Sequence, residues 1–310
     1  MYIGIDLGGT NIAVGIVDGE GKILSKTSSP TCSRRSFEEV VKTMADTCFE
    51  ALSRGGYTEK DIEAIGIGAP GTINNKNGTV MFASNLGWTD VPLTAELQKY
   101  INIPVNIEND ANAAAYGEYM MCGADVKDFI FITLGTGIGG GIIINGEIYR
   151  GFNGAGAEIG HNSFIFGGER CNCGKRGCWE VYGSVSGLIK QTKRAIEENP
   201  NSIMAKAEKI DGRTAFDAAK QGDKAAAKVV SRYIEYVADG ICSIVNIFEP
   251  EVLLIGGGIS KEGDYLLDPI KEYCRNNYYC KHIEQTELGI ATLGNDAGII
   301  GAALAAKNFK

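Results

Sequence analysis

The sequence lacks any apolar run as long as the ~18 residues that a membrane-spanning helix needs. It also has no basic segment at its N-terminus, where Asp6 interrupts the apolar run, so we expect no signal peptide. Positive charge is not in excess either: the net charge is −8, which disfavours nonspecific binding to nucleic acid or to acidic membranes. We therefore expect a cytoplasmic protein without a nucleic-acid or membrane partner.

A framework of paired cysteines is missing as well. The chain has nine cysteines, an odd number. Three of them lie close together between residues 171 and 178, and the others are scattered: Cys32, Cys48, Cys122, Cys242, Cys274 and Cys280. This pattern is typical of reduced thiols in a cytoplasm. The length of 310 residues favours two domains and is ample for a core. The apolar content of 44% is ordinary for a globular protein.

The stretch from Gly154 to Glu180 is the hardest part of the chain to explain by packing alone. It contains one of the two histidines and a group of closely spaced cysteines. The candidate ligands are His161, Cys171, Cys173 and Cys178. One imidazole and three thiolates match the four N/S ligands of a closed structural zinc site. Gly174 and Gly177 would permit the tight turns that return the ligands to one ion. A Cys173–Cys178 disulfide, or buried thiols beside a hydrogen-bonded histidine, is the alternative.

The order of elements is α/β. A glycine-rich turn over residues 8–11 separates two apolar runs, which predicts a β-hairpin. The period of the apolar residues predicts a helix from about Ser36 to Arg54, with Ser36 as its N-cap. Further predicted elements in this half are strands over 22–28, 62–67 and 105–108, and helices over 93–100 and 111–121.

The second half opens as the first does, with a strand over 129–134, a Gly/Thr turn and a second strand over 142–145. Sequence identity between the two openings is weak, so the repeat is inferred from architecture. Helices are predicted over most of 183–248, the last starting at Asp223. The remaining predicted elements are a strand over 252–255 ending in Gly256–Gly258, a helix over 265–275, a strand over 286–291 and a helix over 296–306.

Two segments, 66–71 and 135–140, fit the dinucleotide pattern G-x-G-x-x-G. Both fail in context, because that pattern needs a helix directly after the loop. The P-loop pattern is absent from the sequence. What remains is a pair of Gly/Thr turns whose backbone N–H groups can surround phosphate oxygens without a lysine. Each turn alone is explained by tight turning; together with Gly256–Gly258 they favour a nucleotide.

With these motifs in place, the chain resembles the ROK family of sugar kinases and repressors, and most of all its bacterial glucokinases. The matching motifs are Asp6-Leu7-Gly8-Gly9-Thr10-Asn11, Gly68-Ala69-Pro70-Gly71, Asn85-Leu86-Gly87-Trp88, Glu108-Asn109-Asp110, Leu134-Gly135-Thr136-Gly137, Glu158-Ile159-Gly160-His161, the cysteine segment through Glu180, and Gly256-Gly257-Gly258. They cover essentially the whole chain. Ala157 departs from the family, since many members have glycine before the glutamate.

The resemblance implies a two-lobed actin-like ATPase (ribonuclease H-like) α/β fold with a zinc-binding loop over 161–178. The first lobe would span residues 1–108 with the closing helix 295–310, and the second would span 109–294. ATP would bind in the cleft and a sugar at the hinge.

The resemblance also implies residue roles. Asp110 would be the general base. The sugar contacts would be Gly71, Asn85, Asn109, Glu158, His161 and Glu180. The ATP and Mg²⁺ contacts would be Asp6, Gly8, Gly9, Thr10, Asn11, Thr136, Gly137, Gly257 and Gly258. Zinc would be structural, bound by the histidine and three cysteines named above.

Simpler interpretations stay open for several of these residues. The sequence alone favours a capping role for Asp110 at a helix start, and glutamates such as Glu158 and Glu180 are more often solvated surface charges. A sugar-responsive repressor would need a helix-turn-helix module, which we do not find before the hairpin. A catalytically silent sugar-binding protein, an N-acetylmannosamine or N-acetylglucosamine kinase, and another hexose kinase are further alternatives. We expect a homo-oligomer, a dimer or a tetramer.

Overall fold

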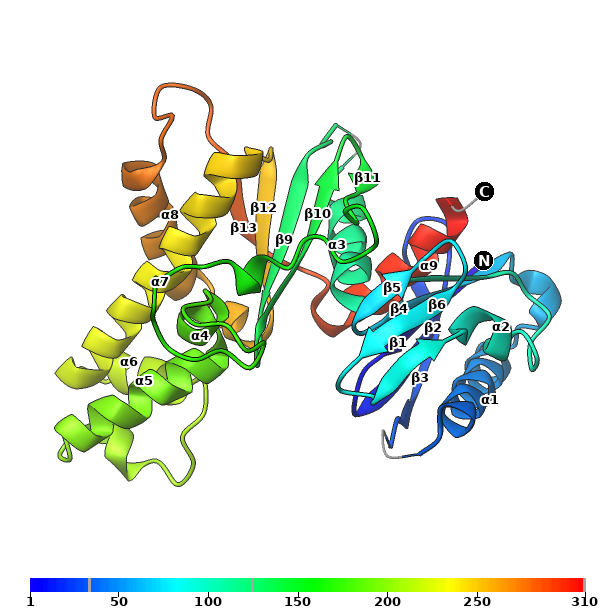
Figure 1. Ribbon diagram of the computed structural model, residues 1–310, viewed down its shortest axis with the longest axis horizontal. Helices are drawn as coiled ribbons and strands as arrows, with labels where there is room; N and C mark the ends of the chain where they lie inside the picture. Colours follow the sequence, from blue (N-terminus) through cyan, green and yellow to red (C-terminus); the bar gives the residue numbers. More distant parts are fainter. Residues whose placement is uncertain (33–34, 124, 309–310) are drawn as a thin grey trace. The chain divides into compact units, whose positions relative to one another are not determined.

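The computed structural model describes residues 1–32, 35–123 and 125–308. The chain divides into two compact units (Figure 1). The first contains Met1–Lys127, Gly141–Ala157 and Leu293–Lys310, and the second contains Asp128–Gly140 and Glu158–Thr292. The two lobes that the family resemblance implies, residues 1–108 with 295–310 and residues 109–294, stay a prediction.

A five-stranded sheet of order β3-β2-β1-β4-β8 forms the centre of the first unit. Its strands are β1 (Tyr2–Leu7), β2 (Asn11–Val17), β3 (Ile23–Pro30), β4 (Ala64–Ala69) and β8 (Val105–Asn109). β1, β2 and β3 pair antiparallel, which confirms the predicted hairpin, whereas β1, β4 and β8 run parallel. The carboxyl ends of the three parallel strands therefore meet at one edge.

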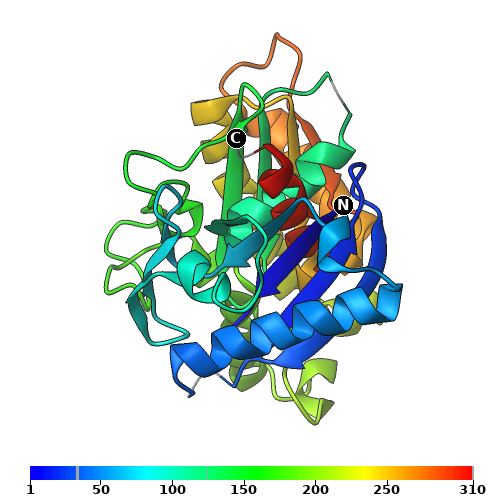
Figure 2. The ribbon, with the colours of Figure 1, turned by 90° about the vertical axis from the view of Figure 1, so that its right-hand side faces the viewer.

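The two faces of this sheet carry different side chains because successive residues of a strand alternate in direction. Ile3, Ile5 and Leu7 join the large apolar core that includes α1 (Phe37–Gly55). Figure 2 shows α1, in blue, crossing that face. The opposite face packs against α9 (Ala297–Asn308). A Cβ on Gly66 would lie 1.8 Å from the carbonyl oxygen of Ala302, so the glycine lets α9 pack directly on the strand.

Local signals in the sequence explain two helices of the first unit. Ser36 caps α1, as predicted, and also forms a capping box with Glu39. The buried apolar side chains of α1 face the core. α3 (Asp110–Met121) begins directly after β8 and is capped by Asn109. α3 packs along α9.

A small antiparallel sheet of order β5-β6-β7 lies between β4 and β8 in the chain and was not predicted. Its strands are β5 (Thr72–Asn74), β6 (Thr79–Ala83) and β7 (Trp88–Val91), followed by α2 (Leu93–Leu97). Gly71 is followed by the strand β5 and not by a helix, which confirms that segment 66–71 is not a dinucleotide-binding motif. A short helix, η1 (Glu59–Asp61), precedes β4.

The second five-stranded sheet has the order β11-β10-β9-β12-β13, the same order as the first. Its strands are β9 (Phe129–Leu134), β10 (Ile138–Ile144), β11 (Glu147–Ile148), β12 (Val252–Gly256) and β13 (Glu287–Ile290). β9, β12 and β13 run parallel. The predicted architectural repeat is therefore confirmed. β10 starts at Ile138, directly after the glycine turn, so segment 135–140 also leads into a strand.

The second unit is otherwise mostly helical, as predicted. Its helices are η2 (Ile159–His161), α4 (Glu180–Gly183), α5 (Val185–Glu198), η3 (Ile203–Lys206), α6 (Thr214–Lys220), α7 (Lys224–Phe248), η4 (Gly258–Glu262) and α8 (Asp264–Asn277). A last short helix, η5 (Gly294–Asp296), precedes α9 in the first unit. Asp223 caps α7, the long predicted helix. Among the described residues, no helix is both long and apolar enough to cross a membrane.

Candidate functional site

The carboxyl edge of the first sheet collects several of the predicted site residues. Asp6 on β1 is in register with Gly68 on β4, and Gly68 is in register with Glu108 on β8. A Cβ built on Gly68 would lie 3.6 Å from Cα of Asp110. Asp6 and Asp110 therefore flank the same glycine, at the edge where open α/β sheets bind ligands.

Asn109 and Asp110 have distinct structural roles. The Asn109 side chain caps α3: its Oδ1 accepts hydrogen bonds from the N–H groups of Ala111 at 2.9 Å and Asn112 at 3.1 Å. Its Nδ2 donates to the carbonyl oxygen of Gly71 at 3.0 Å, which links two predicted sugar contacts. Asp110 is the first residue of α3, and its Oδ1 accepts from Ala111 N–H at 2.8 Å. The capping interpretation of Asp110 is therefore wrong, because Asn109 is the cap.

The hairpin turn between β1 and β2 is tightly held. The N–H of Gly8 donates to Asn11 O at 2.9 Å, and the Thr31 hydroxyl donates to Gly8 O at 2.7 Å. Asn85 lies beside this turn, since a Cβ on Gly9 would be 3.6 Å from Asn85 Nδ2. The turn thus keeps a fixed backbone beside a predicted sugar contact.

Asp6 is the carboxylate predicted to orient Mg²⁺. Burial raises its pKa, and the charge of Lys26 acts in the opposite direction. The carboxyl group lies close to α9, because a Cβ on Gly298 would be 3.0 Å from Asp6 Cγ. A carboxylate that has lost much of its water gains more from a cation than an exposed one does.

In the second unit the four predicted zinc ligands come together. The ligand atoms of His161, Cys171, Cys173 and Cys178 all lie within 4.8 Å of one another. His161 Nδ1 is 3.7 Å from Cys171 Sγ, and the sulfurs of Cys173 and Cys178 are 3.6 Å apart. Two sulfurs on one tetrahedral zinc are about 3.8 Å apart, given Zn–S bonds of about 2.3 Å. The donor set and its spacing fit zinc.

The backbone of the cysteine loop requires glycine at position 177. Gly177 has φ of 75°, and a Cβ there would lie 1.7 Å from Ile165 O. Cys173 and Cys178 are both free thiols in the structure, so the alternative disulfide is not formed.

The thiols of the loop have unequal pKa values. Burial raises the pKa of Cys178 to about 12 and also raises that of Cys171. A hydrogen bond from the Lys175 backbone holds the pKa of Cys173 below its usual range. A bound divalent cation lowers the pKa of each coordinating thiol, so all three sulfurs can bind it as thiolates despite these differences.

Glu158 and Glu180, the carboxylates that flank the cysteine loop, are placed differently. Glu158 is exposed and directly precedes η2, where its carbonyl accepts from His161 N–H at 3.0 Å. Glu180 Oε2 accepts from Ile138 N–H at 3.0 Å, and its Oε1 lies 3.8 Å from Cys171 Sγ. Glu180 thus connects the cysteine loop to the turn that contains Thr136 and Gly137.

The predicted nucleotide-binding glycines lie at the carboxyl edge of the second sheet. Gly256 at the end of β12 is in register with Thr133 near the end of β9. Gly257 has φ of 87°, and a Cβ there would lie 2.3 Å from Leu134 O. The turn at Gly257–Gly258 therefore packs against the start of the Thr136–Gly137 turn.

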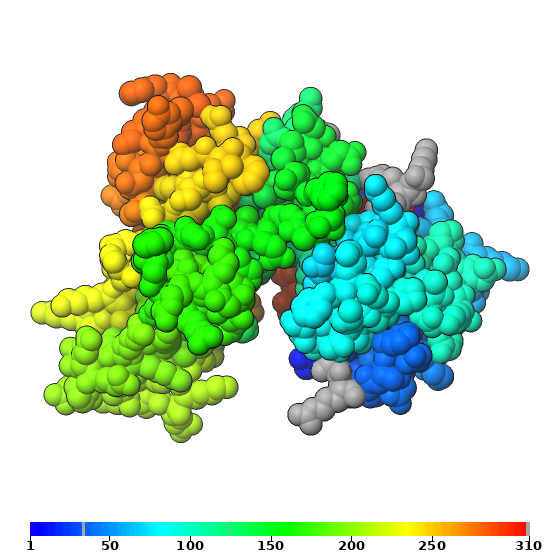
Figure 3. Space-filling model, in the orientation of Figure 1, coloured from blue at the N-terminus to red at the C-terminus, as the bar shows by residue number. Residues whose placement is uncertain are grey.

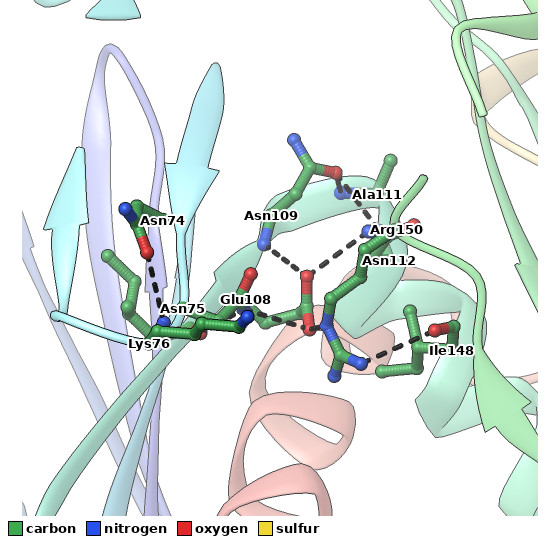
Figure 4. A network of polar contacts seen from close by, with 10 residues as sticks. Asn74, Asn75, Lys76, Glu108, Asn109, Ala111, Asn112, Ile148 and Arg150 are labelled. Carbon is green, nitrogen blue, oxygen red and sulfur yellow. Dashed lines mark hydrogen bonds and ion pairs between the residues drawn. The ribbon is translucent and has the colours of Figure 1, made fainter. Parts of the chain in front are cut away.

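Sequence reasoning missed the residues that hold the Asn109–Asp110 junction. The buried carboxylate of Glu108 contacts Arg150 and Asn75, which come from distant parts of the chain (Figure 4). The one available signal was a charged residue at an inward position of β8. Nothing in the sequence identifies Arg150 or Asn75 as its partners.

A separate groove of about 830 Å³ lies between α7 and α8. Figure 3 shows the surfaces of these helices side by side, yellow for α7 and orange for α8. Tyr265, Pro269 and Tyr273 are among its lining residues, and none of the predicted site residues is. The groove is therefore not part of the candidate site.

Two α/β sheets of identical strand order, each with glycine turns at its carboxyl edge, define an actin-like fold of the sugar-kinase class. The chain belongs to the ROK family, whose profile matches residues 2–308.

Relatives within the family differ in their stated roles. A glucokinase of Halalkalibacterium halodurans is 39% identical over 306 residues, 97% of this chain and 93% of that relative. A ROK family glucokinase of Streptomyces griseus, crystallised with glucose and AMPPNP, has a TM-score of 0.83 and 36% identity, covering 99% of each chain. A xylose repressor of Caldicellulosiruptor bescii is 30% identical over 303 residues, 96% of this chain and 76% of the repressor.

Proposed function

We propose that this chain is an ATP-dependent hexokinase that transfers the γ-phosphoryl group of ATP to the 6-hydroxyl of glucose. The observation that carries the proposal is the position of Asp110: a carboxylate at the first turn of α3, beside Asp6 at the carboxyl edge of the sheet. The similarity to glucokinases over nearly the whole chain supports glucose as the sugar.

Asp110 acts as the general base in this proposal. Phosphoryl transfer requires mainly positioning and charge stabilisation, plus one group that accepts the proton of the attacking hydroxyl. The helix N-terminus favours the ionised carboxylate. The hydrogen bond from Ala111 N–H to Oδ1 orients the carboxylate at the start of the helix, and this carboxylate is the group that accepts the sugar proton in the proposal.

The sugar contacts come from two groups of residues. In the first unit, the proposed contacts are Gly71 and Asn109, which are hydrogen-bonded to each other next to Asp110, and Asn85, which lies beside Gly9. In the second unit, Glu158, His161 and Glu180 are the predicted partners of the ring hydroxyls. A site of carboxylates and amides selects a sugar by its hydroxyls, since each missing hydroxyl leaves a buried polar group unpaired, at about 1–3 kcal/mol.

ATP and Mg²⁺ require backbone donors and one carboxylate. The turns at Gly8–Asn11 and at Thr136–Gly137 supply N–H groups for phosphate oxygens, and Gly257 and Gly258 leave room for the adenosine. Asp6 is the residue that would hold Mg²⁺, through water. When bound, the ion neutralises charge on the transferring phosphoryl group.

A structural zinc ion completes the proposal. His161, through Nδ1, and Cys171, Cys173 and Cys178 would hold it, which leaves Nε2 of His161 for a sugar hydroxyl. The ion's role is to fix the loop that leads to Glu180. Metal analysis after exhaustive dialysis should find one zinc per chain, and a metal-free protein purified under reducing conditions would contradict this assignment.

An N-acetylhexosamine kinase, another hexose kinase and a sugar-responsive regulator without kinase activity are the alternatives. The regulator is favoured by one observation, the similarity to a xylose repressor over 96% of this chain. The presence of Asp110 in this geometry favours the kinase.

The experiment that tests the proposal compares kcat/KM for several sugars at one concentration of ATP and Mg²⁺. The panel is glucose, mannose, allose, fructose, N-acetylmannosamine and N-acetylglucosamine, with polyphosphate as a second donor. Glucose with ATP should give the highest value. A higher value for any N-acetylhexosamine would refute glucose as the sugar, and no turnover of any sugar would refute the kinase. Light scattering on the same sample should give a dimer or a tetramer.

A further inference from the structure

Glu108 is a buried carboxylate with a full set of hydrogen-bond donors. The residue is 3% exposed. Its Oε1 accepts from the N–H of Asn109 at 2.9 Å and from Asn112 Nδ2 at 3.1 Å. Its Oε2 accepts from Arg150 Nε at 2.7 Å and from Asn75 Nδ2 at 3.2 Å. Each oxygen therefore has two donors, as a buried charge requires.

The donors come from separate segments of the first unit (Figure 4). Asn112 lies in the first turn of α3, Asn75 follows β5, and Arg150 follows β11. Asn75 also donates to the carbonyl oxygen of Ile107 at 2.6 Å, and Arg150 Nη1 donates to Ile148 O at 3.3 Å. The network thus joins both sides of the β8–α3 junction to two other parts of the chain.

Stability alone is a weak reason for such a network. A buried ion pair loses most of its Coulomb energy to desolvation, and apolar side chains of similar volume often give an equally stable core. What the pair adds is a fixed geometry. Here that geometry includes the backbone N–H of Asn109, which is next to Asp110 in the chain.

We propose that Glu108, held by Arg150, is a positioning residue that fixes the Asn109–Asp110 backbone and thereby the orientation of the Asp110 carboxylate. The inference rests on the proposed role of Asp110 as the base. An error of about 1 Å in the position of a reacting group lowers turnover by about 10²-fold. Loss of the network therefore lowers kcat, while the sugar contacts made by other residues persist.

The chain offers a matched control on the same helix. Glu118 in α3 is 1% exposed, and its Oε1 accepts from Leu293 N–H at 2.8 Å. It lies eight residues after Asp110, about 12 Å along the helix. Glu118→Gln makes the same chemical change in an equally buried carboxylate, away from the junction.

The experiment measures kcat, KM for the sugar and thermal stability in the full-length protein with its metal. We expect Glu108→Gln to lower kcat by about 10- to 100-fold with KM changed by less than about threefold. Glu118→Gln should keep kcat within about twofold, whatever its effect on stability. Arg150→Lys, which keeps a charged donor, should retain more of kcat than Arg150→Met.

Arg150→Met leaves the buried Glu108 carboxylate without its ion-pair partner, so this variant can misfold. The double variant Glu108→Gln/Arg150→Met removes both charges and controls for that effect. It should be more stable than Arg150→Met but no more active than Glu108→Gln, because the pair acts as a unit. The positioning role is refuted if Glu108→Gln lowers kcat no more than Glu118→Gln does, or if its effect is confined to KM.

Failure of the proposed function is distinguishable. If the wild type phosphorylates another hexose, the same variants are compared on that sugar. If it phosphorylates none, the kinase assignment fails, and hydrogen exchange decides the positioning claim. Glu108→Gln must then speed exchange in the peptide over residues 105–118 more than Glu118→Gln does, and equal protection would refute it.

Discussion

Asn109 and Asp110 are neighbours in the sequence with different consequences for function. The amide of Asn109 satisfies the first N–H groups of α3, so the carboxylate of Asp110 is not needed as the cap. Sequence reasoning found the pair but could not assign the cap, because Asn and Asp are about equally good at that position. It could not find Glu108's partners, because packing alone brings Asn75 and Arg150 to β8.

The Asp110→Asn variant tests the base directly. It should lower kcat by about 10²–10⁴-fold, the usual contribution of a positioned base, while sugar affinity measured by calorimetry changes little. The amide keeps the shape and can accept from Ala111 N–H, so the helix start is preserved. Turnover close to that of the wild type would show that Asp110 has only a structural role.

Ala157 occupies a backbone conformation that explains the glycine common in its family. Its φ is 63°, in the left-handed region that costs a non-glycine residue about 1–2 kcal/mol. Ala157→Gly removes this strain but loses about 0.5–1 kcal/mol through greater freedom of the unfolded chain. We therefore expect the free energy of unfolding to rise by up to about 1.5 kcal/mol, with the sugar preference unchanged.

The control is Ala155→Gly, two residues earlier and outside the left-handed set. Ala155→Gly increases the conformational freedom of the unfolded chain but relieves no backbone strain in the folded chain. It should therefore lower the free energy of unfolding by about 0.5–1 kcal/mol. Urea denaturation of both variants measures the two effects. Equal losses in both would contradict the strain at Ala157.

At the scale of elements, the helices with a complete local signal were the most predictable. α1 has a capping box, a regular apolar period and a C-terminal glycine, Gly56, all within its own sequence. The sheet β5-β6-β7 has no such signal, because its strands are only three to five residues long and are joined by turns. β10 begins among glycines, which have low strand propensity, so pairing within the sheet overrides the local preference.

The cap of α7 predicts a dependence of stability on pH. Asp223 accepts from the N–H groups of Ala225, Ala226 and Ile203 and from the Ser202 hydroxyl. Its pKa is lowered, chiefly by the hydrogen bond from Ala226 N–H. Because the folded pKa lies below the unfolded value of about 3.9, this contribution is complete above that pH and is lost as pH falls through the folded pKa.

Asp223→Ala should therefore lower the free energy of unfolding by about 1–2 kcal/mol at pH 7, and by progressively less below about pH 4. Asp223→Asn is the control, since it retains a capping oxygen but has no charge to titrate. Denaturation curves from pH 7 downward measure all three proteins. A difference between wild type and Asp223→Ala that does not shrink in acid would show that the charge is irrelevant to the cap.

At the scale of the whole molecule, the chain has two compact units and a tryptophan in each. Trp88 in β7 belongs to the first unit, and Trp179, which follows Cys178, belongs to the second. Trp179 is 1% exposed, and its Nε1 donates to the carbonyl oxygen of Tyr236 on α7 at 2.8 Å. The cysteine loop is therefore packed onto the helical part of the second unit, and its order should affect the stability of that unit.

Removal of the proposed zinc ion tests this coupling. A metal that binds the folded loop and not the unfolded chain stabilises by about 3–4 kcal/mol when free zinc exceeds its dissociation constant by two to three orders of magnitude. Chelation should lower the denaturation midpoint seen by Trp179 fluorescence in a Trp88→Phe variant. Hydrogen exchange in β1 and β4 should stay unchanged, because those strands belong to the other unit.

Two cysteine variants complete the zinc experiment. Cys173→Ala should behave like the chelated protein, whereas Cys280→Ala, an exposed cysteine outside the cluster, should respond to chelation as the wild type does. Equal loss of protection in both units would mean that they unfold as one cooperative body. No response of Trp179 to chelation would mean that the loop keeps its structure without a metal, and Glu180 would then depend on its hydrogen bond from Ile138 N–H instead.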